Sequence, residues 1–242
     1  MSVRRLVRIS GSLLALFGVL AIAWGFVTWQ WGDPVTSLYT RWKQRELSSS
    51  YDRIAVRFAI PRPTATSPKQ PKPAREAAVV KAAARHFRAS VEEGQAIGRI
   101  EVPRLGLDMV MVNGTSNGTL KTGPGRDPRT FMPGEGELVY VAGHRTTYGA
   151  PFAHIDRLEH GDRVVLRMPY ATAVYRVTSH VIVPADDLAR LESSGREVVA
   201  LQACHPRFSA SQRYIVYAKP VTISPIRASS SPNASAAAIP KP

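Results

Sequence analysis

Short apolar runs dominate the second half of the chain. From Ala96 onward, runs such as LDMVMV, RVVLRM and VVALQA are separated by turn-forming Gly, Pro, Asn and Asp residues. Runs of this length that are rich in Val and Ile are typical of β-strands, and no helical pattern alternates with them. The pattern predicts an antiparallel β-barrel or sandwich. The expected strands, in chain order, are IGRIEV, LDMVMV, GELVYVAG, RVVLRM, AVYRVTSHVIV, VVALQA and YIVYA.

A helical period precedes these strands. Val80, Ala84, Phe87 and Val91 recur at three- or four-residue spacing within residues 76–92. This spacing places the four side chains on one face of a helix. It predicts one amphipathic helix leading into the β-rich domain.

The N-terminal segment is apolar throughout. Residues Ile9 to Trp31 carry no charge, and at about 1.5 Å per residue a helix over them spans roughly 35 Å, enough to cross a hydrocarbon core of about 30 Å. Arg4, Arg5 and Arg8 precede it, so we expect a transmembrane helix with a cytoplasmic N-terminus and the remaining chain outside the cell. The alternative is a signal peptide cleaved after the AIA pattern at residues 21–23, which exports the domain equally.

Two further segments lack the apolar positions that a core requires. Residues 32–75 are polar and basic, ending in PRPTATSPKQPKPAR, and we expect an extended proline-rich linker. From Ser224 the chain has few bulky apolar residues, and we expect a disordered tail. The predicted organisation is a cytoplasmic N-terminus (1–8), a transmembrane helix (9–31), the linker (32–75), the amphipathic helix (76–92), the β-rich domain (93–223) and the tail (224–242).

The net charge of +14 raises the question of nucleic-acid binding. Residues 1–88 hold 15 Lys and Arg against 4 Asp and Glu, whereas residues 89–242 hold 17 against 14. The basic excess therefore belongs to the anchor and linker, and we expect no nucleic-acid partner.

Cys204 is the only cysteine in 242 residues, so it has no partner for a disulfide within the chain. A lone thiol is a small buried hydrophobe, a link between two chains, or a reactive group. A catalytic thiol needs a group that handles protons and a donor for the oxyanion that forms at the attacked carbonyl. His144 follows one expected strand, and Arg213 begins the strand after Cys204.

These residues occur in a recognisable order. The run AGHRTTYGAPF, then an apolar strand that ends in Cys204, then HPRFSASQRYIVYA, resembles the sortase family of cysteine transpeptidases, and especially class E. The resemblance covers roughly residues 96–221. It implies an eight-stranded β-barrel in which Cys204 is the nucleophile, His144 donates and accepts the proton, and Arg213 positions the substrate and stabilises the oxyanion.

The resemblance also implies an activity and its partners. Such an enzyme cleaves an LAxTG- or LPxTG-like C-terminal sorting motif of an exported protein between Thr and Gly, forming a thioester. An amine of a peptidoglycan precursor or a pilin then resolves the thioester, with no cofactor. A tyrosine at the place of Tyr148 is associated with class E motifs that carry alanine after the leading leucine, so Tyr148 is an expected substrate-binding residue.

One departure from the family lies beside the nucleophile. Ala200 and Ala203 stand where the family usually has threonines. A hydrogen bond near the site contributes about 1 kcal/mol, so we expect the change at Ala203, taken as a second substrate-binding residue, to alter the rate and the substrate preference.

Two alternatives remain open at this stage. An L,D-transpeptidase is also an exported cysteine enzyme with a β-rich domain, but it has histidine and glycine immediately before its cysteine, where this chain has Gln202 and Ala203. A non-catalytic wall-binding module would keep Cys204 buried and inert. We expect no metal site, because there is no closely spaced set of Cys and His residues, and acidic pairs such as Asp186 and Asp187 are typical of solvated surfaces.

Overall fold

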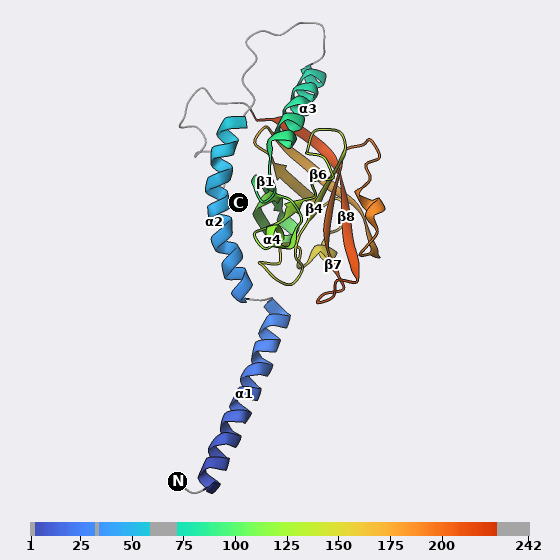
Figure 1. The fold of residues 1–242 in the computed structure, drawn as a ribbon. Helices are drawn as coiled ribbons and strands as arrows, with labels where there is room; N and C mark the ends of the chain where they lie inside the picture. Colours follow the sequence, from blue (N-terminus) through green and yellow to red (C-terminus); the bar gives the residue numbers. More distant parts are fainter. Residues whose placement is uncertain (1–2, 32–33, 59–71, 227–242) are drawn as a thin grey trace.

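The computed structural model describes residues 3–31, 34–58 and 72–226 (Figure 1). Its helices are α1 (Val3–Trp31), α2 (Pro34–Phe58), α3 (Lys72–Ser90) and α4 (Asn117–Leu120), with short 3-10 turns η1 (Pro103–Leu105), η2 (Ile155–Arg157) and η3 (Leu188–Leu191). Its strands are β1 (Ala96–Val102), β2 (Leu107–Asn113), β3 (Gly125–Arg126), β4 (Leu138–Ala142), β5 (Arg163–Arg167), β6 (Ala171–Pro184), β7 (Val198–His205) and β8 (Gln212–Pro225).

The eight strands close into a barrel in the order β1-β2-β3-β4-β7-β8-β6-β5, which confirms the fold expected from the sequence. Most neighbouring strands are antiparallel, whereas β2 with β3 and β4 with β7 are parallel. Alternate side chains fill the barrel interior, where Ile100, Leu166 and Val216 are completely buried. All seven strands expected from the apolar runs are present.

The eighth strand, β3, corresponds to none of the seven runs that the apolar pattern predicted as strands. It has two residues, Gly125 and Arg126, and pairs with both β2 and β4. A Cβ atom on Gly125 would lie 2.0 Å from the backbone oxygen of Gly114, so this close approach of two backbones requires glycine.

Helix α3 covers one end of the barrel (Figure 1). Val80, Ala84 and Phe87 are buried against the core, as their spacing predicted. The ring of Phe87 packs edge-on against Tyr170 at 5.8 Å. The helix covers residues 72–90 rather than the expected 76–92, so Val91 lies beyond its end and packs against the core from the following segment.

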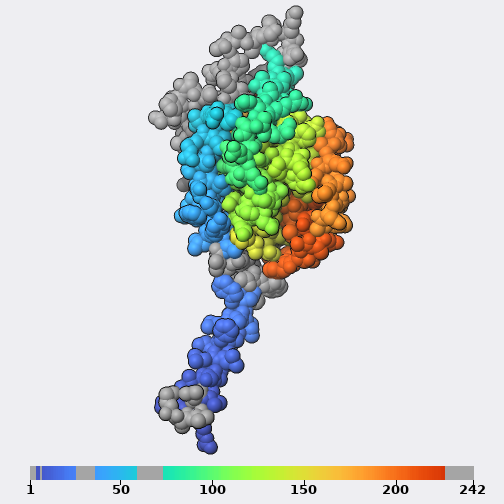
Figure 2. All heavy atoms as spheres, viewed as in Figure 1, coloured from blue at the N-terminus to red at the C-terminus, as the bar shows by residue number. Residues whose placement is uncertain are grey.

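The prediction of an extended linker over residues 32–75 is wrong for most of its length. Residues 34–58 form α2, a helix that lies along the side of the barrel (Figures 1 and 2). Its inner face includes Thr40, Gln44, Tyr51, Ile54 and Phe58, whose spacings of three, four or seven residues place them on one side of the helix. Three of these five side chains, Thr40, Gln44 and Tyr51, make hydrogen bonds to backbone carbonyls of the domain, so the apolar periodicity alone did not reveal this face. The proline-rich part of the linker lies largely outside the described residues.

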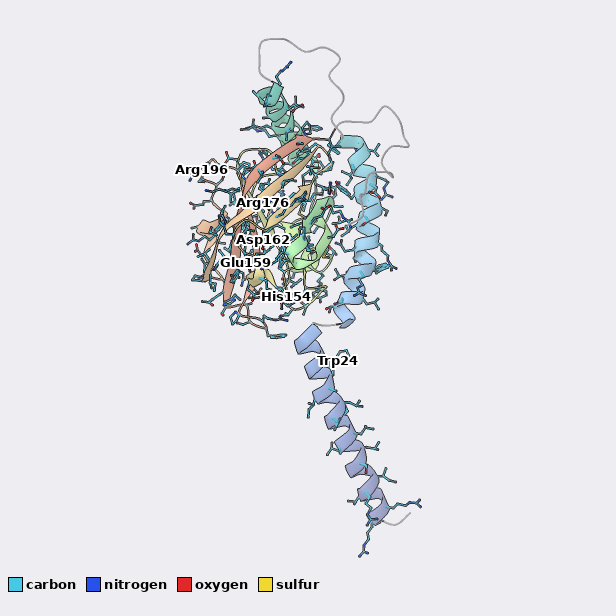
Figure 3. The ribbon with its side chains drawn as sticks, turned by 180° about the vertical axis from the view of Figure 1, so that it is seen from behind. Trp24, His154, Glu159, Asp162, Arg176 and Arg196 are labelled. Atoms are coloured by element: carbon cyan, nitrogen blue, oxygen red, sulfur yellow. The ribbon has the colours of Figure 1, made fainter. Side chains whose placement is uncertain are left out.

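Helix α1 extends away from the barrel in Figure 1. Within the described chain, Val7–Gly25 is the one helical segment long and apolar enough to cross a membrane, and none of it is buried. Leu14, Phe17 and Ile22 are exposed on different sides of the helix. Because a helix that is apolar all round requires apolar surroundings, α1 has the properties of a membrane anchor. Trp24 lies near the end of α1 that is closer to the barrel (Figure 3).

The expected tail begins later than residue 224. Strand β8 continues to Pro225, pairing with β6 up to Ala171, so the barrel ends two residues beyond the predicted boundary. The remainder of the predicted tail, from residue 227, lies outside the described residues.

Candidate active site

The parallel pairing of β4 with β7 places His144 and Cys204 at the same end of the sheet. Ala142 is the register partner of Gln202, and the N–H of Gly143 donates to the carbonyl of Gln202 at 3.0 Å. His144 and Cys204 each follow this pair by two residues. Figure 1 shows the end of β7 and its connection to β8 at the end of the barrel nearest α1.

The antiparallel pairing of β7 with β8 adds Arg213 to the same place. Cys204 and Arg213 are direct register partners. All three expected catalytic residues line one cavity of about 290 Å³, whose floor includes Tyr140 and Ile215. The structure therefore brings Cys204, His144 and Arg213 around one space that can hold part of an extended peptide.

The alternation of side chains along β7 decides which residues face this cavity. Gln202 and Cys204 line the cavity, and Cys204 is half-buried. Ala203 is completely buried in the barrel core, and Ala200 is completely buried in a second apolar cluster with Leu138 and Ile215. The expectation that Ala203 contacts substrate is corrected, because successive residues of a strand point to opposite faces. A threonine at Ala203 would direct its hydroxyl into the core.

His144 occupies an environment that favours a neutral imidazole. Burial first, and then the positive charge of Lys121, lowers the pKa of His144 below its usual value of 6.5. Its Nε2 atom is buried and has no hydrogen-bond partner among the described residues. A neutral ring whose nitrogen has no partner, lining the same cavity as Cys204, is a group that can accept and return a proton.

The side chain of Arg213 is hydrogen-bonded to the backbone of residues just before it in the chain. Its Nη1 atom donates to the carbonyl of Ala210 at 2.8 Å and to that of Gln212 at 3.0 Å. No described residue accepts a hydrogen bond from Nε or Nη2, so these donors remain for a substrate oxygen. The guanidinium fork suits this task, because its donors are fixed in one plane.

Tyr148 does not line the cavity that contains Cys204. The centroid of its ring lies 5.1 Å from the centroid of the His144 ring. Nζ of Lys121 lies 5.5 Å from the centroid of the Tyr148 ring. Tyr148, Gly149 and Ala150 have φ values of 52°, 72° and 40°. Left-handed backbone at a non-glycine residue costs about 1 kcal/mol or more, so this turn depends on contacts with surrounding residues.

The sequence interpretation did not single out Arg145, which directly follows His144. Its side chain is 5% exposed, and Nη1 donates to the carbonyl of Cys204 at 3.3 Å and lies 2.8 Å from Nδ1 of His205. Nη2 donates to Asp156 at 2.9 Å. Arg145 thus joins the segment after β4 to the end of β7 and to η2. In the sequence, the only sign that Arg145 could join these segments is its position directly after His144.

Two acidic residues, Asp127 and Asp187, also line the cavity. Burial of Asp127 opposes its ionisation, but hydrogen bonds from Arg129 outweigh burial, and the pKa of Asp127 is lowered. Within residues 3–31, 34–58 and 72–226, no three His, Cys, Asp or Glu side chains gather in a way that could hold a metal ion.

Comparison with known proteins identifies the family of the β-barrel domain. A sequence model of the sortase domain matches residues 100–221. The chain is 33% identical over 136 residues to sortase D of Bacillus subtilis, a match that covers 54% of this chain and 67% of that protein. It is 28% identical over 149 residues to sortase SrtE1 of Streptomyces coelicolor, covering 54% of this chain and 42% of that protein.

Solved structures show the same likeness. The crystal structure of sortase E1 from Streptomyces coelicolor with a tripeptide in its active site gives a TM-score of 0.51 at 27% identity, covering 55% of this chain and 91% of that chain. Sortase E from Streptomyces avermitilis gives a TM-score of 0.50 at 30% identity, covering 56% and 93%.

Proposed function

Because the chain belongs to the sortase family of transpeptidases, most like class E, we propose that Cys204, His144 and Arg213 join exported proteins to an amine through a thioester. The observation that carries the proposal is the strand register, which brings these three residues to one cavity. The substrate is an LAxTG- or LPxTG-like sorting motif near the C-terminus of the exported protein.

The first half of the reaction transfers the acyl group to the enzyme. The Cys204 thiol gives its proton to His144 as its sulfur attacks the carbonyl carbon of the motif threonine. The free N–H groups of Arg213 donate to the oxyanion. The bond between threonine and glycine breaks, His144 protonates the leaving glycine amine, and a thioester remains on Cys204.

The second half transfers the acyl group to an acceptor. An amine of a peptidoglycan precursor or a pilin attacks the thioester carbonyl and gives a proton to His144. The carbon–sulfur bond breaks, and the sulfur regains a proton from His144. The products are a new amide and the original thiol, so no cofactor is consumed.

We further propose that α1 anchors the enzyme as a single-pass helix, with the barrel on the outer side of the membrane. The motivating observations are the unburied apolar surface of Val7–Gly25 and the arginines at its N-terminal end, Arg4, Arg5 and Arg8. A protein without this anchor would not be held near secreted substrates as they leave the membrane.

The alternative of a non-catalytic wall-binding module requires an inert, buried thiol. Cys204 is half-buried and faces a cavity rather than the core. The alternative of an L,D-transpeptidase mechanism predicts activity on stem peptides that contain D-amino acids rather than on sorting motifs.

The proposal is tested by incubating the full chain in detergent with LAxTG and LPxTG peptides and a short amine acceptor. We expect an amide product from a sorting-motif peptide in the parent and none in Cys204→Ala. A tetrapeptide stem ending in D-alanine serves as the competing substrate. Product from that stem alone would support the L,D-transpeptidase alternative, and product in Cys204→Ala would remove the thiol from the mechanism.

A further inference from the structure

The first turns of α2 lie directly against the turn that follows His144 (the His144 turn, residues 147–150). Oγ1 of Thr36 accepts a hydrogen bond from the backbone N–H of Tyr148 at 2.8 Å. The ring of Tyr39 meets the ring of Tyr148 edge-on, with centroids 6.4 Å apart and planes at 75°. Two residues of α2 therefore contact the backbone and the side chain of the residue that packs on His144.

A third residue of α2 holds the other side of this turn. Thr40 is 1% exposed, and its Oγ1 donates to the carbonyl of Lys121 at 3.0 Å. A Cβ atom on Gly149 would lie 3.3 Å from Cγ2 of Thr40, so the turn passes close to this side chain. Lys121 in turn places its ammonium group over the ring of Tyr148.

Gln44 attaches α2 to the barrel one turn further along. Its Nε2 donates to the carbonyls of Val110 and Thr122, each at 2.9 Å, and its Oε1 accepts from the N–H of Val110 at 2.7 Å. The amide thus pairs with both backbone groups of a β2 residue, as a neighbouring strand would. This attachment fixes the distance between α2 and the His144 turn.

The His144 turn has a backbone that requires such support. Tyr148, Gly149 and Ala150 are three successive residues with positive φ. If the contacts from α2 were lost, the backbone of Tyr148 could relax toward a common conformation and its ring would leave the imidazole. Water would then reach His144, whose neutral state depends on burial.

We propose that Thr36 and Tyr39 are positioning residues for His144, acting through Tyr148. Catalysis then depends on the helix that joins the membrane anchor to the barrel, not on the barrel alone. This inference rests on the proposed function, because it takes His144 as the proton-transfer group. The charged or titratable groups that face His144 or its cavity are Lys121, Tyr148, Cys204, Arg213, Asp127, Arg129, Tyr140 and Asp187.

The test compares the full chain in detergent with Thr36→Val, which has the same shape but no acceptor oxygen. We expect kcat to fall about fivefold with little change in KM, the size expected for one lost hydrogen bond. Thr36→Ser retains the hydroxyl and should restore the parent kcat. The matched control is Thr222→Val, which makes the same chemical change at an exposed position of β8.

A second readout reports the environment of His144 without using activity. In a Cys204→Ala background, the titration of the His144 ring is followed by NMR and assigned by its loss in His144→Gln. We expect Thr36→Val and Tyr39→Ala to raise the pKa of His144 toward 6.5, because both admit water, whereas Thr36→Ser and Thr222→Val leave it unchanged. Equal melting temperatures of Thr36→Val and Thr222→Val would show that the effect is local.

An unchanged kcat and an unchanged His144 titration in both Thr36→Val and Tyr39→Ala would overturn the inference. The two readouts also separate it from the proposed function. If the parent acts on no sorting-motif peptide but the His144 titration moves as expected, the proposed function fails and the positioning of His144 by α2 stands.

Discussion

Cys204 on β7 and Arg213 on β8 are direct antiparallel partners, so the thiol and the guanidinium leave adjacent strands at the same end of the sheet. The parallel neighbour of β7, strand β4, brings His144 to that end from the other side. Cys204 and Arg213 lie in paired strands, whereas His144 lies two residues beyond the end of β4, so its placement also depends on the segment that follows β4.

Replacing Arg213 by lysine should lower kcat/KM by about 100-fold or more. An ammonium group on a flexible stem cannot provide the fixed, planar donors of the guanidinium to an oxyanion. The control is Arg207→Lys, in the same β7–β8 connection but outside the cavity. Turnover of peptide is the measurement, and near-parent turnover in Arg213→Lys would exclude Arg213 from oxyanion stabilisation.

Replacing Lys121 by methionine should raise the pKa of His144. The positive charge of Lys121 disfavours the charged imidazolium, as burial does, so the folded pKa lies below 6.5. Removing the charge leaves only burial, and the pKa moves upward toward 6.5. Titration of His144 by NMR in a Cys204→Ala background measures the shift, with the exposed Lys219→Met as the control. A pKa that stays in place or falls would contradict the assigned cause.

Replacing Arg145 by methionine should lower the free energy of unfolding by about 2 kcal/mol. The substitution removes the buried N–H groups that donate to the carbonyl of Cys204 and to Asp156. The carbonyl of Cys204 then lacks the hydrogen bond from Arg145. Denaturant unfolding measures the loss, and the exposed Arg163→Met on β5 is the control. Equal losses in the two variants would show that Arg145 does not join these segments energetically.

Tyr148 should influence the choice between LAxTG and LPxTG motifs. Proline needs more space than alanine and lacks the N–H that the phenol could accept, so we expect the parent to prefer alanine by roughly 10- to 150-fold. Because the ring lies beside His144 rather than in the Cys204 cavity, the effect requires the peptide to extend past the imidazole. The ratio of turnover for the two peptides is compared in the parent and in Tyr148→Ala. An equal ratio in both would show that this ring does not read the motif.

The sequence predicted the barrel well because its strands are buried on one face and separated by turn residues. Strand β3 was not predicted, because a strand of two residues is too short to show an alternation of apolar and polar positions. Helix α2 escaped prediction because Thr40 and Gln44 dock through hydrogen bonds, which no apolar pattern reveals, although residues 35–60 contain neither glycine nor proline. The order of His144, Cys204 and Arg213 indicated the site through its likeness to a family. The contacts of Ala203 and Arg145 could not be predicted from the sequence. They depend on which face of a strand or segment each side chain occupies, and only the structure shows this.

The central claim is that Cys204 carries the acyl group of a sorting motif as a thioester. Intact-mass measurement of the full chain, incubated with an LAxTG peptide and no added amine, tests it directly. We predict a mass increase equal to the acyl fragment that ends at threonine, released by hydroxylamine and absent in Cys204→Ala. An amide product formed without any acyl-enzyme when an amine is added, or the same mass increase in Cys204→Ala, would contradict the account.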